Sequence, residues 1–236
     1  MSEERGIVLP KVYKAEQEKY EKYNGLPKLS YSQIGSFTDP LYKNDYIRQY
    51  FFGEKQEGGI FAIYGSQCGE WWETGGKVVG DMLSESDIEV LKKLPRPDGA
   101  QYEYEIVVEL DTDEGKICVQ GFIDQLVTDG KDATVIDLKT GNLLKKKDFY
   151  GGDEYQQTTL YSYHMETEGY NIKESKVFLV SRKGNGRGVH VLRLDGPIET
   201  IPTPYSKERA EKYFEKVRKT AKEISDLYKV YLKVNK

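Results

Sequence analysis

Short apolar and β-branched runs at residues 117–124 and 134–139 predict two β-strands in the middle of the chain. The stretch 128–132 between them carries turn residues, so the two runs are expected to form a hairpin. Asp124 closes the first strand of this hairpin and Asp137 lies at the end of the second. The pattern therefore predicts two carboxylates at adjacent strand ends.

The second strand ends in Asp137-Leu138-Lys139, a tripeptide with candidate chemistry. Because side chains alternate between the two faces of a strand, Asp137 and Lys139 should share one face while Leu138 points into the core. The same acid-to-lysine spacing recurs at 114–116 and 129–131, but both of those sit in glycine turns. A solvated strand end is the alternative interpretation of the tripeptide.

Two neighbouring carboxylates repel each other unless a cation lies between them. Oxygen ligands of this kind suit the hard divalent ions Mg²⁺ and Mn²⁺. Asp124 and Asp137 are therefore candidate metal ligands.

Further elements are predicted around the hairpin. They are helices at residues 12–23, from Ser84 to before Pro95, at 153–167 with Asp153 as N-cap, and from Ser206 onward, with strands at 102–110, 176–181 and 189–194. With 236 residues, 38% of them hydrophobic, the chain can bury a full core. We expect one α/β (α+β) domain at residues 28–236, preceded by a charged arm at 1–27. The apolar stripe of the C-terminal helix should pack in the core, with oligomerisation as the second interpretation.

Two predicted helical segments carry further candidates. Gln157 and Tyr161 lie four positions apart and therefore share a helix face. Glu70 and Glu73 also lie close together on one segment, beside two tryptophans. The alternatives are ordinary half-buried helix residues for the first pair and a solvated helix face for the second.

Together these residues resemble the PD-(D/E)XK nuclease superfamily, in its RecB-like exonuclease branch. The resemblance covers about residues 30–195 and follows one order: a helical acid, Gly-x-x-Asp at 121–124, Asp-x-Lys at 137–139 and Gln-x-x-x-Tyr at 157–161. This four-part order is far more specific than any of its parts.

The helical acid departs from the family pattern. Such relatives typically have Gly, then His four residues on, then Glu after another four. Here Gly65 and Glu73 match, but Gly69 replaces the His. We favour Glu73 as the helical acid, with Glu70 as the alternative.

The resemblance implies a restriction-endonuclease-like core, with a central mixed β-sheet flanked by helices. It also implies Mg²⁺-dependent hydrolysis of phosphodiester bonds, with Mn²⁺ as an alternative ion. The implied metal ligands are Asp124, Asp137, the carbonyl of Leu138, and Glu73. Lys139 would orient or deprotonate the attacking water, and Gln157 and Tyr161 would position Lys139 and the substrate backbone.

The formal net charge of −4 is unusual for a protein that binds DNA, so positive charge would have to be local. Lysines 145–147 form one candidate cluster, and Arg182, Lys183 and Arg187 form another. Either could line a channel for a DNA strand, and ordinary solvated loops are the alternative.

The remaining composition bounds the cellular setting. No run of eighteen apolar residues exists and the first residues are charged, so we expect a soluble, cytoplasmic protein. Cys68 and Cys118 are expected to be free buried thiols, too few for a four-cysteine iron–sulfur cluster.

The expected function is a Mg²⁺-dependent DNA exonuclease in recombination, repair or phage DNA processing. The alternatives are a structure-specific or restriction-type endonuclease on the same core, and a non-catalytic nucleic-acid-binding module. DNA, single- or double-stranded, is the expected partner. A second copy of the chain or a recombination or replication protein is a further candidate partner.

Overall fold

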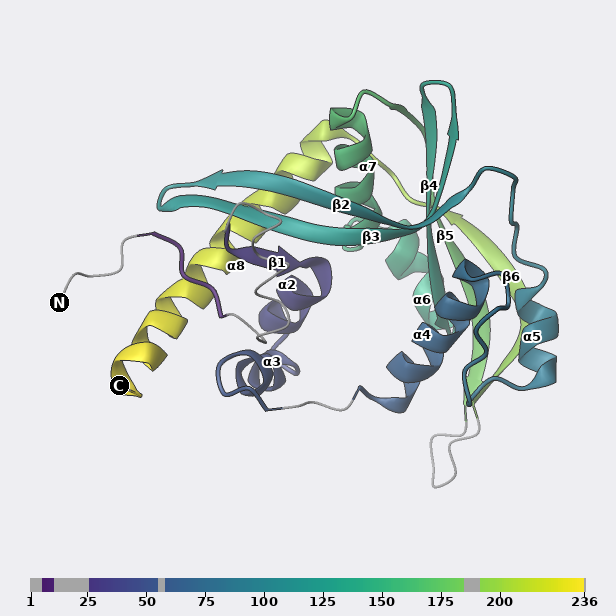
Figure 1. The fold of residues 1–236 in the computed structure, drawn as a ribbon, viewed down its shortest axis with the longest axis horizontal. Coiled ribbons are helices and arrows are strands. Elements are labelled where there is room, and N and C mark those ends of the chain that lie inside the picture. Colours follow the sequence, from purple (N-terminus) through teal and green to yellow (C-terminus); the bar gives the residue numbers. More distant parts are fainter. Residues whose placement is uncertain (1–5, 11–25, 55–57, 185–191, 236) are drawn as a thin grey trace. The chain divides into compact units, whose positions relative to one another are not determined.

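The computed structural model describes residues 6–10, 26–54, 58–184 and 192–235. The helix predicted at 12–23 and the residue Arg187 lie outside the described residues. In the described part of the chain, six strands form a mixed sheet accompanied by seven helices (Figure 1). The predicted α/β class is confirmed.

The chain divides into two compact units. The first unit comprises Met1–Glu57, Ile106–Gly121 and Glu211–Lys236, and the second comprises Gly58–Glu105 and Phe122–Ala210. Strands β2 (Gln101–Thr112) and β3 (Gly115–Asp129) contribute residues to both. The boundary between an arm at 1–27 and a domain at 28–236 stays a prediction.

In the first unit, β1 (Lys28–Ser30) pairs in parallel with β3. Ser30 then caps α2 (Tyr31–Thr38) through a capping box, and α3 (Lys43–Tyr50) follows. The C-terminal helix α8 (Lys207–Val234) buries its predicted apolar stripe as far as Ile224. Core packing of that part of the stripe is thus confirmed.

In the second unit, β4 (Asp132–Gly141) pairs antiparallel with β3 and parallel with β5 (Asn171–Gly184). Asp129 faces Asp132 across the turn between β3 and β4, so the predicted hairpin is confirmed. Strand β6 (Leu192–Pro202) completes this part of the sheet, antiparallel to β5.

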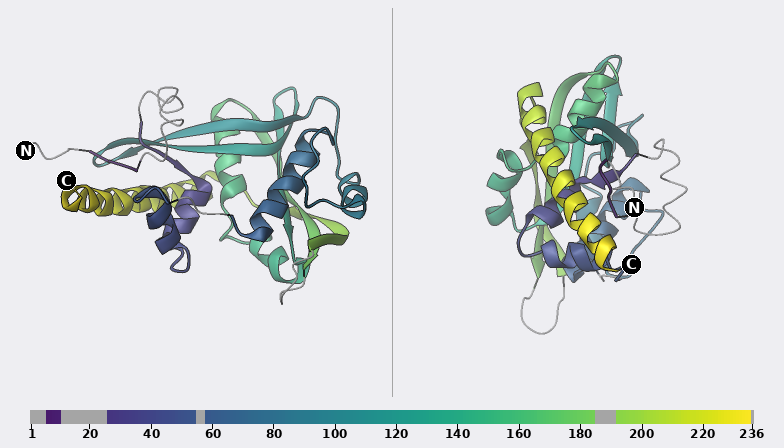
Figure 2. Two further views of the ribbon diagram at one scale, coloured as in Figure 1. Left: turned by 60° about the horizontal axis from the view of Figure 1, so that its bottom comes forward. Right: turned by 90° about the vertical axis from the view of Figure 1, so that its left-hand side faces the viewer.

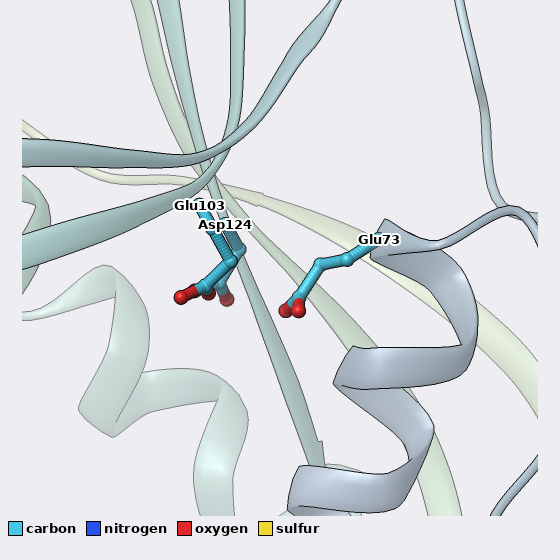
Figure 3. Close-up of side chains that lie close together, drawn as sticks. All are labelled: Glu73, Glu103 and Asp124. Carbon is cyan, nitrogen blue, oxygen red and sulfur yellow. The ribbon is translucent and has the colours of Figure 1, made fainter. Parts of the chain in front are cut away.

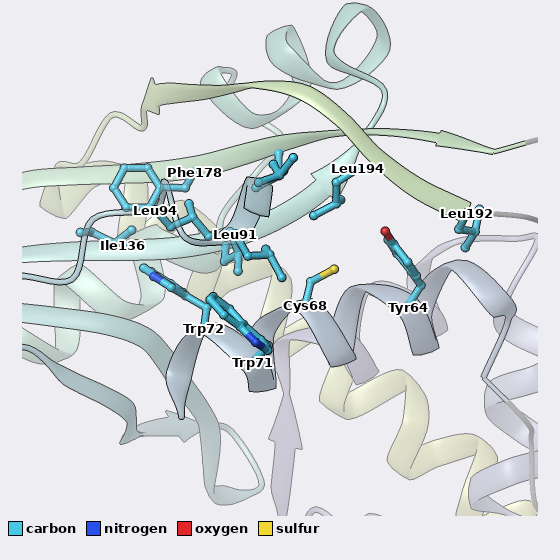
Figure 4. Close-up of a cluster of buried hydrophobic side chains, with 13 residues drawn as sticks. Tyr64, Cys68, Trp71, Trp72, Leu91, Leu94, Ile136, Phe178, Leu192 and Leu194 are labelled. Atoms are coloured by element: carbon cyan, nitrogen blue, oxygen red, sulfur yellow. The ribbon is translucent and has the colours of Figure 1, made fainter. Parts of the chain in front are cut away.

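Helices α4 (Ile60–Glu73) and α5 (Glu85–Leu91) bury a hydrophobic cluster against β4, β5 and β6 (Figure 4). The predicted start of α5 is confirmed, because Ser84 caps the helix in a capping box. Helix α5 packs against β6 (Figure 2). Leu138 belongs to the cluster, as does Ile136. Alternation along β4 therefore turns Asp137, which lies between them, away from α4.

Helices α6 (Leu143–Gly151) and α7 (Gln157–Thr167) form the crossover that the parallel strands β4 and β5 require (Figure 1). The prediction of a single helix from Asp153 was wrong at its start, because α7 begins four residues later with Gln156 as N-cap. The side chain of Asp153 instead pairs with Arg209, which also donates to the carbonyls of Gly152 and Tyr155. These bonds hold the backbone ahead of α7 out of the helix.

Two other segments of the second unit lie in regular elements. Lysines 145–147, for which solvated loops were the alternative to a channel for a DNA strand, lie in α6. The strand predicted at 189–194 is described from Leu192 and continues to Pro202, because its ladder with β5 extends to Lys176.

Candidate active site

Strands β3 and β4 stop pairing beside two of the predicted site residues. The ladder between them ends at the pair of Gln125 and Ile136. One residue earlier in β3, Asp124 accepts a hydrogen bond on Oδ2 from the backbone N–H of Leu138, at 2.6 Å. A side-chain carboxylate thus binds an amide of β4, and this charge-assisted bond fixes its orientation.

Three carboxylates converge next to this point. Glu73 ends α4, Glu103 lies on β2 and Asp124 lies on β3, and their carboxylate oxygens lie within 4.8 Å of one another (Figure 3). Burial raises the pKa of Glu73 to about 8, and repulsion from Glu103 and Asp124 adds to the effect. Burial likewise raises the pKa of Asp124 to about 7, with repulsion from Asp137 as the next cause. We call Glu73, Glu103 and Asp124 the acid group.

The acid group fits a hard divalent cation. Its donors are all carboxylate oxygens, the ligands that Mg²⁺ and Mn²⁺ prefer. Glu73 also stands at the C-terminal end of a helix, where the helix dipole disfavours a negative charge. In addition, Oδ1 of the fully buried Asp137 has no hydrogen-bond partner in the part of the chain that the structure describes. A cation would offset each of these unfavourable terms.

Glu103 was not identified from the sequence. Among the described residues it is the one non-glycine residue with a positive φ, at 50°. A side chain in this left-handed region costs about 1–3 kcal/mol, and such strain tends to occur at functional sites. No spacing in the sequence relates Glu103 to the other acids, so only the folded chain reveals that Glu103 belongs to the acid group.

Asp137 and Lys139 lie on one face of β4, as the strand alternation predicted. Lys139 Nζ lies 2.6 Å from Asp137 Oδ2, and the side chain of Lys139 is 27% exposed whereas that of Asp137 is fully buried. Burial alone would lower the pKa of Lys139, but the negative charges of Asp137 and Asp124 outweigh it and raise the pKa above its ordinary value. Lys139 is therefore held as a cation beside the acid group.

A second residue that the sequence did not reveal is Tyr155. Its hydroxyl donates to Asp137 Oδ2 at 2.7 Å and lies 3.1 Å from Gln157 Oε1. The amide of Gln157 lies 2.5 Å from the hydroxyl of Tyr161. The single hydroxyl proton of Tyr155 cannot be donated to both Asp137 and Gln157. The network is therefore best satisfied when the side-chain amide of Gln157 donates to the Tyr155 hydroxyl and accepts from the Tyr161 hydroxyl. Tyr155 thereby links Asp137 to the two residues predicted on α7.

A cleft of about 610 Å³ opens beside the acid group. One face of α4 forms its first wall, from Phe61 near the start of the helix to Glu73 at its end. The opposite wall carries Asp124, Lys139 and Thr140. All of the residues that line the cleft belong to the second unit.

A model of the PD-(D/E)XK nuclease superfamily matches residues 70–230, about two thirds of the chain. This chain belongs to the PD-(D/E)XK nuclease superfamily. Membership implies a nucleic-acid substrate. It also confirms the restriction-endonuclease-like fold that the sequence predicted.

Two solved structures were compared with this PD-(D/E)XK nuclease, both at low sequence identity. A candidate exonuclease from Eubacterium rectale superimposes with a TM-score of 0.54 at 10% identity, over 92% of this chain and 86% of that one. The protein SSO0001 superimposes with a TM-score of 0.42 at 12% identity, over 84% of this chain and 81% of that one. No curated protein matches the chain.

In this PD-(D/E)XK nuclease, the predicted site residues fall into two neighbouring groups. Glu73 and Asp124 belong to the acid group, while Asp137, Lys139, Gln157 and Tyr161 belong to the network around Tyr155. The amide of Leu138 joins Asp124 to β4. Glu70 lines the cleft but lies outside the acid group. The catalytic and metal-binding roles of these residues stay predictions.

The basic clusters of this nuclease are partly neutralised. Lys147 pairs with Glu199 at 2.7 Å, and Lys183 pairs with Asp195. Arg182 lies against the ring of Phe61, 4.5 Å from its centroid, at the end of the cleft. Arg182 thus contacts residues that line the cleft.

Two further expectations concern the whole chain. Both cysteines are free and buried, as predicted. No described helix is long and apolar enough to cross a membrane.

Proposed function

We propose that this protein is a metal-dependent deoxyribonuclease, and specifically an exonuclease that hydrolyses phosphodiester bonds from DNA ends. Mg²⁺ is the proposed ion, with Mn²⁺ as a substitute. The observation that carries the proposal is the acid group beside a buried aspartate–lysine pair, at the point where β3 and β4 stop pairing. Processing of DNA in recombination, repair or phage replication is the proposed setting.

In this proposal the residues have separate roles. Asp124, Asp137, the carbonyl of Leu138 and the helical acid Glu73 hold the metal, and Glu103 adds a fourth carboxylate. A bound divalent ion would polarise the scissile phosphate and lower the pKa of the attacking water. Lys139 places a positive charge where the transition state becomes more negative, and it orients the attacking water. Gln157 and Tyr161 position Lys139 and the substrate backbone, and Tyr155 fixes the orientation of Asp137.

Two observations support the exonuclease over the endonuclease. The spacing of Gln157 and Tyr161 resembles that of RecB-like exonucleases, and the fold resembles that of the candidate exonuclease from Eubacterium rectale. A structure-specific or restriction-type endonuclease remains the second candidate. A non-catalytic binding module is disfavoured, because such a protein gains nothing from keeping repulsive carboxylates together.

The proposal is tested with end-labelled linear duplex, linear single strands and covalently closed circles, each incubated with Mg²⁺, Mn²⁺ or EDTA. We expect metal-dependent loss of the linear molecules while the circles stay intact. Nicked or linearised circles would replace the exonuclease by the endonuclease. Absence of cleavage with either metal by folded protein would contradict the proposal.

A further inference from the structure

The cleft extends along the whole of α4, well beyond the acid group. The helix residues that line it recur every three to four positions, so they form one continuous face from Phe61 to Glu73. The twelve steps from Phe61 to Glu73, at 1.5 Å each, span about 18 Å. This length matches roughly five nucleotides of a stacked strand at 3.4 Å per nucleotide.

The middle of this helix face carries only small side chains. Ala62, Gly65 and Ser66 line the cleft here. A Cβ atom added at Gly65 would lie 3.3 Å from Oγ1 of Thr140 on the opposite wall, so the two walls approach closely. The two walls therefore meet at Gly65 and Thr140, and a nucleic-acid strand would lie over this contact rather than between the walls.

The end of the cleft remote from the acid group carries an exposed aromatic ring. Phe61 is 46% exposed although it lies in the first turn of helix α4. Arg182 holds it in place: its guanidinium lies 4.5 Å from the ring centroid, and its Nη1 donates to the backbone carbonyl of Phe61 at 3.0 Å. The same nitrogen lies 3.4 Å from Thr140 Oγ1, which ties the ring to both walls of the cleft.

Charge also differs between the two ends. The acid group lies at the C-terminal end of α4, whereas the N-terminal end has no acidic residue in its first turn and lies beside Arg182. The helix dipole adds partial positive charge at that N-terminal end. A phosphate backbone is therefore favoured there without a metal.

We propose that Phe61, held by Arg182, is a stacking subsite for an unpaired base of the substrate strand, a few nucleotides from the phosphate at the acid group. An exposed ring stacks on any base whose face is bare, and base faces are bare in single strands but covered in a duplex. The subsite thus favours a single-stranded end without sequence preference. The identification of the ligand as a DNA strand rests on the proposed function.

The test is equilibrium binding in EDTA, measured by fluorescence anisotropy with labelled oligothymidylates of ten and four nucleotides and a blunt duplex. Phe61→Ala should weaken binding of the ten-nucleotide strand about tenfold, in the range that one lost base stack produces. The four-nucleotide strand, which in EDTA is attracted to the positive end of the cleft at Phe61, should weaken by a similar factor, whereas the duplex should change less than twofold. Phe61→Tyr should restore binding.

Ile63→Ala is the matched control, because Ile63 lies on the same helix at 42% exposure but does not line the cleft. Unchanged binding of the ten-nucleotide strand by Phe61→Ala would overturn the subsite, as would an equal loss for all three ligands or for Ile63→Ala. Cleavage assays keep the two proposals apart. Metal-dependent cleavage without a Phe61 effect would sink the subsite alone, and Phe61-dependent binding without cleavage would sink the proposed function alone.

Discussion

Replacement of Asp124 by asparagine should stabilise the metal-free protein at pH 8 much more than at pH 5. Burial and repulsion from Asp137 raise the pKa of the Asp124 carboxyl group to about 7. Asparagine keeps an oxygen that can accept the N–H of Leu138, which lies 2.6 Å from Oδ2, but it carries no charge. The substitution therefore removes the ionisation and keeps the hydrogen bond.

The sign and the size follow from linkage. The folded-state pKa lies above the ordinary value of 3.8, so the protonated carboxyl favours the folded state. This contribution is fully present below about pH 4 and is lost as the pH rises through about 7. Between pH 5 and pH 8 the wild type loses roughly 3 kcal/mol in this way, at about 1.4 kcal/mol per pKa unit. For a chain of this length, that is a change in Tm of about 5–10 °C.

The assay is thermal unfolding of wild type and Asp124→Asn, followed by circular dichroism at pH 5, 6.5 and 8. In EDTA the variant's advantage in Tm should grow by about 5–10 °C from pH 5 to pH 8. Mg²⁺ at pH 8 should raise the Tm of the wild type more than that of the variant, because a ligand stabilises the state that binds it. Asp129→Asn, exposed at the end of the same strand, serves as the control. A Tm difference that is the same at all three pH values would refute the reasoning.

Three further substitutions test other parts of the site and fold. In EDTA, Glu103→Gly should be more stable to unfolding than Glu103→Gln by about 1 kcal/mol and should therefore have the higher Tm, since glycine adopts the positive φ without strain. Equal Tm values would contradict the strain. Tyr155→Phe should lower kcat at least tenfold with unchanged circular dichroism, because Asp137 loses its hydroxyl donor; wild-type kcat would exclude this positioning role. Asp87→Ala should reduce the free energy of urea unfolding by about 2–5 kcal/mol, since the buried amide of Leu194 loses its acceptor; a loss below about 1 kcal/mol would count against it.

The hairpin of β3 and β4 could be predicted because its determinants are local. Alternation along one strand is sufficient to place Asp137 and Lys139 on one face and Leu138 in the core. The start of α5 could also be predicted locally. The side chain of Ser84 accepts from the backbone N–H of Asp87, and the side chain of Asp87 accepts from the backbone N–H of Ser84.

The parts that could not be predicted depend on contacts between residues far apart in the chain. The sequence predicts Asp153 as a helix cap, but Arg209 pairs with Asp153 and binds the carbonyls of Gly152 and Tyr155 on either side of it, so α7 starts later. That shift leaves Tyr155 outside the helix, where its hydroxyl can reach Asp137. No local pattern contains the information that an arginine more than fifty residues away controls this turn.

Glu103 illustrates a second limit. Its strand was predicted, but glutamates recur along that strand, and alternation alone does not say which of them meets the other acids. The positive φ at Glu103 reorients one side chain within the strand. Such a backbone conformation at a non-glycine residue has no sequence signature, because glycine would be the expected residue there.

The central claim is that the acid group and Lys139 form a metal-dependent nuclease site. The most direct measurement is the rate of release of end label from linear DNA, with Mg²⁺ or EDTA, by wild type and Lys139→Ala. Lys131→Ala is the matched control, since Lys131 is an exposed lysine at the turn of the same hairpin. We predict Mg²⁺-dependent release by wild type and Lys131→Ala, and loss of nearly all release by folded Lys139→Ala. Near-wild-type release by Lys139→Ala, or release that persists in EDTA, would contradict the account.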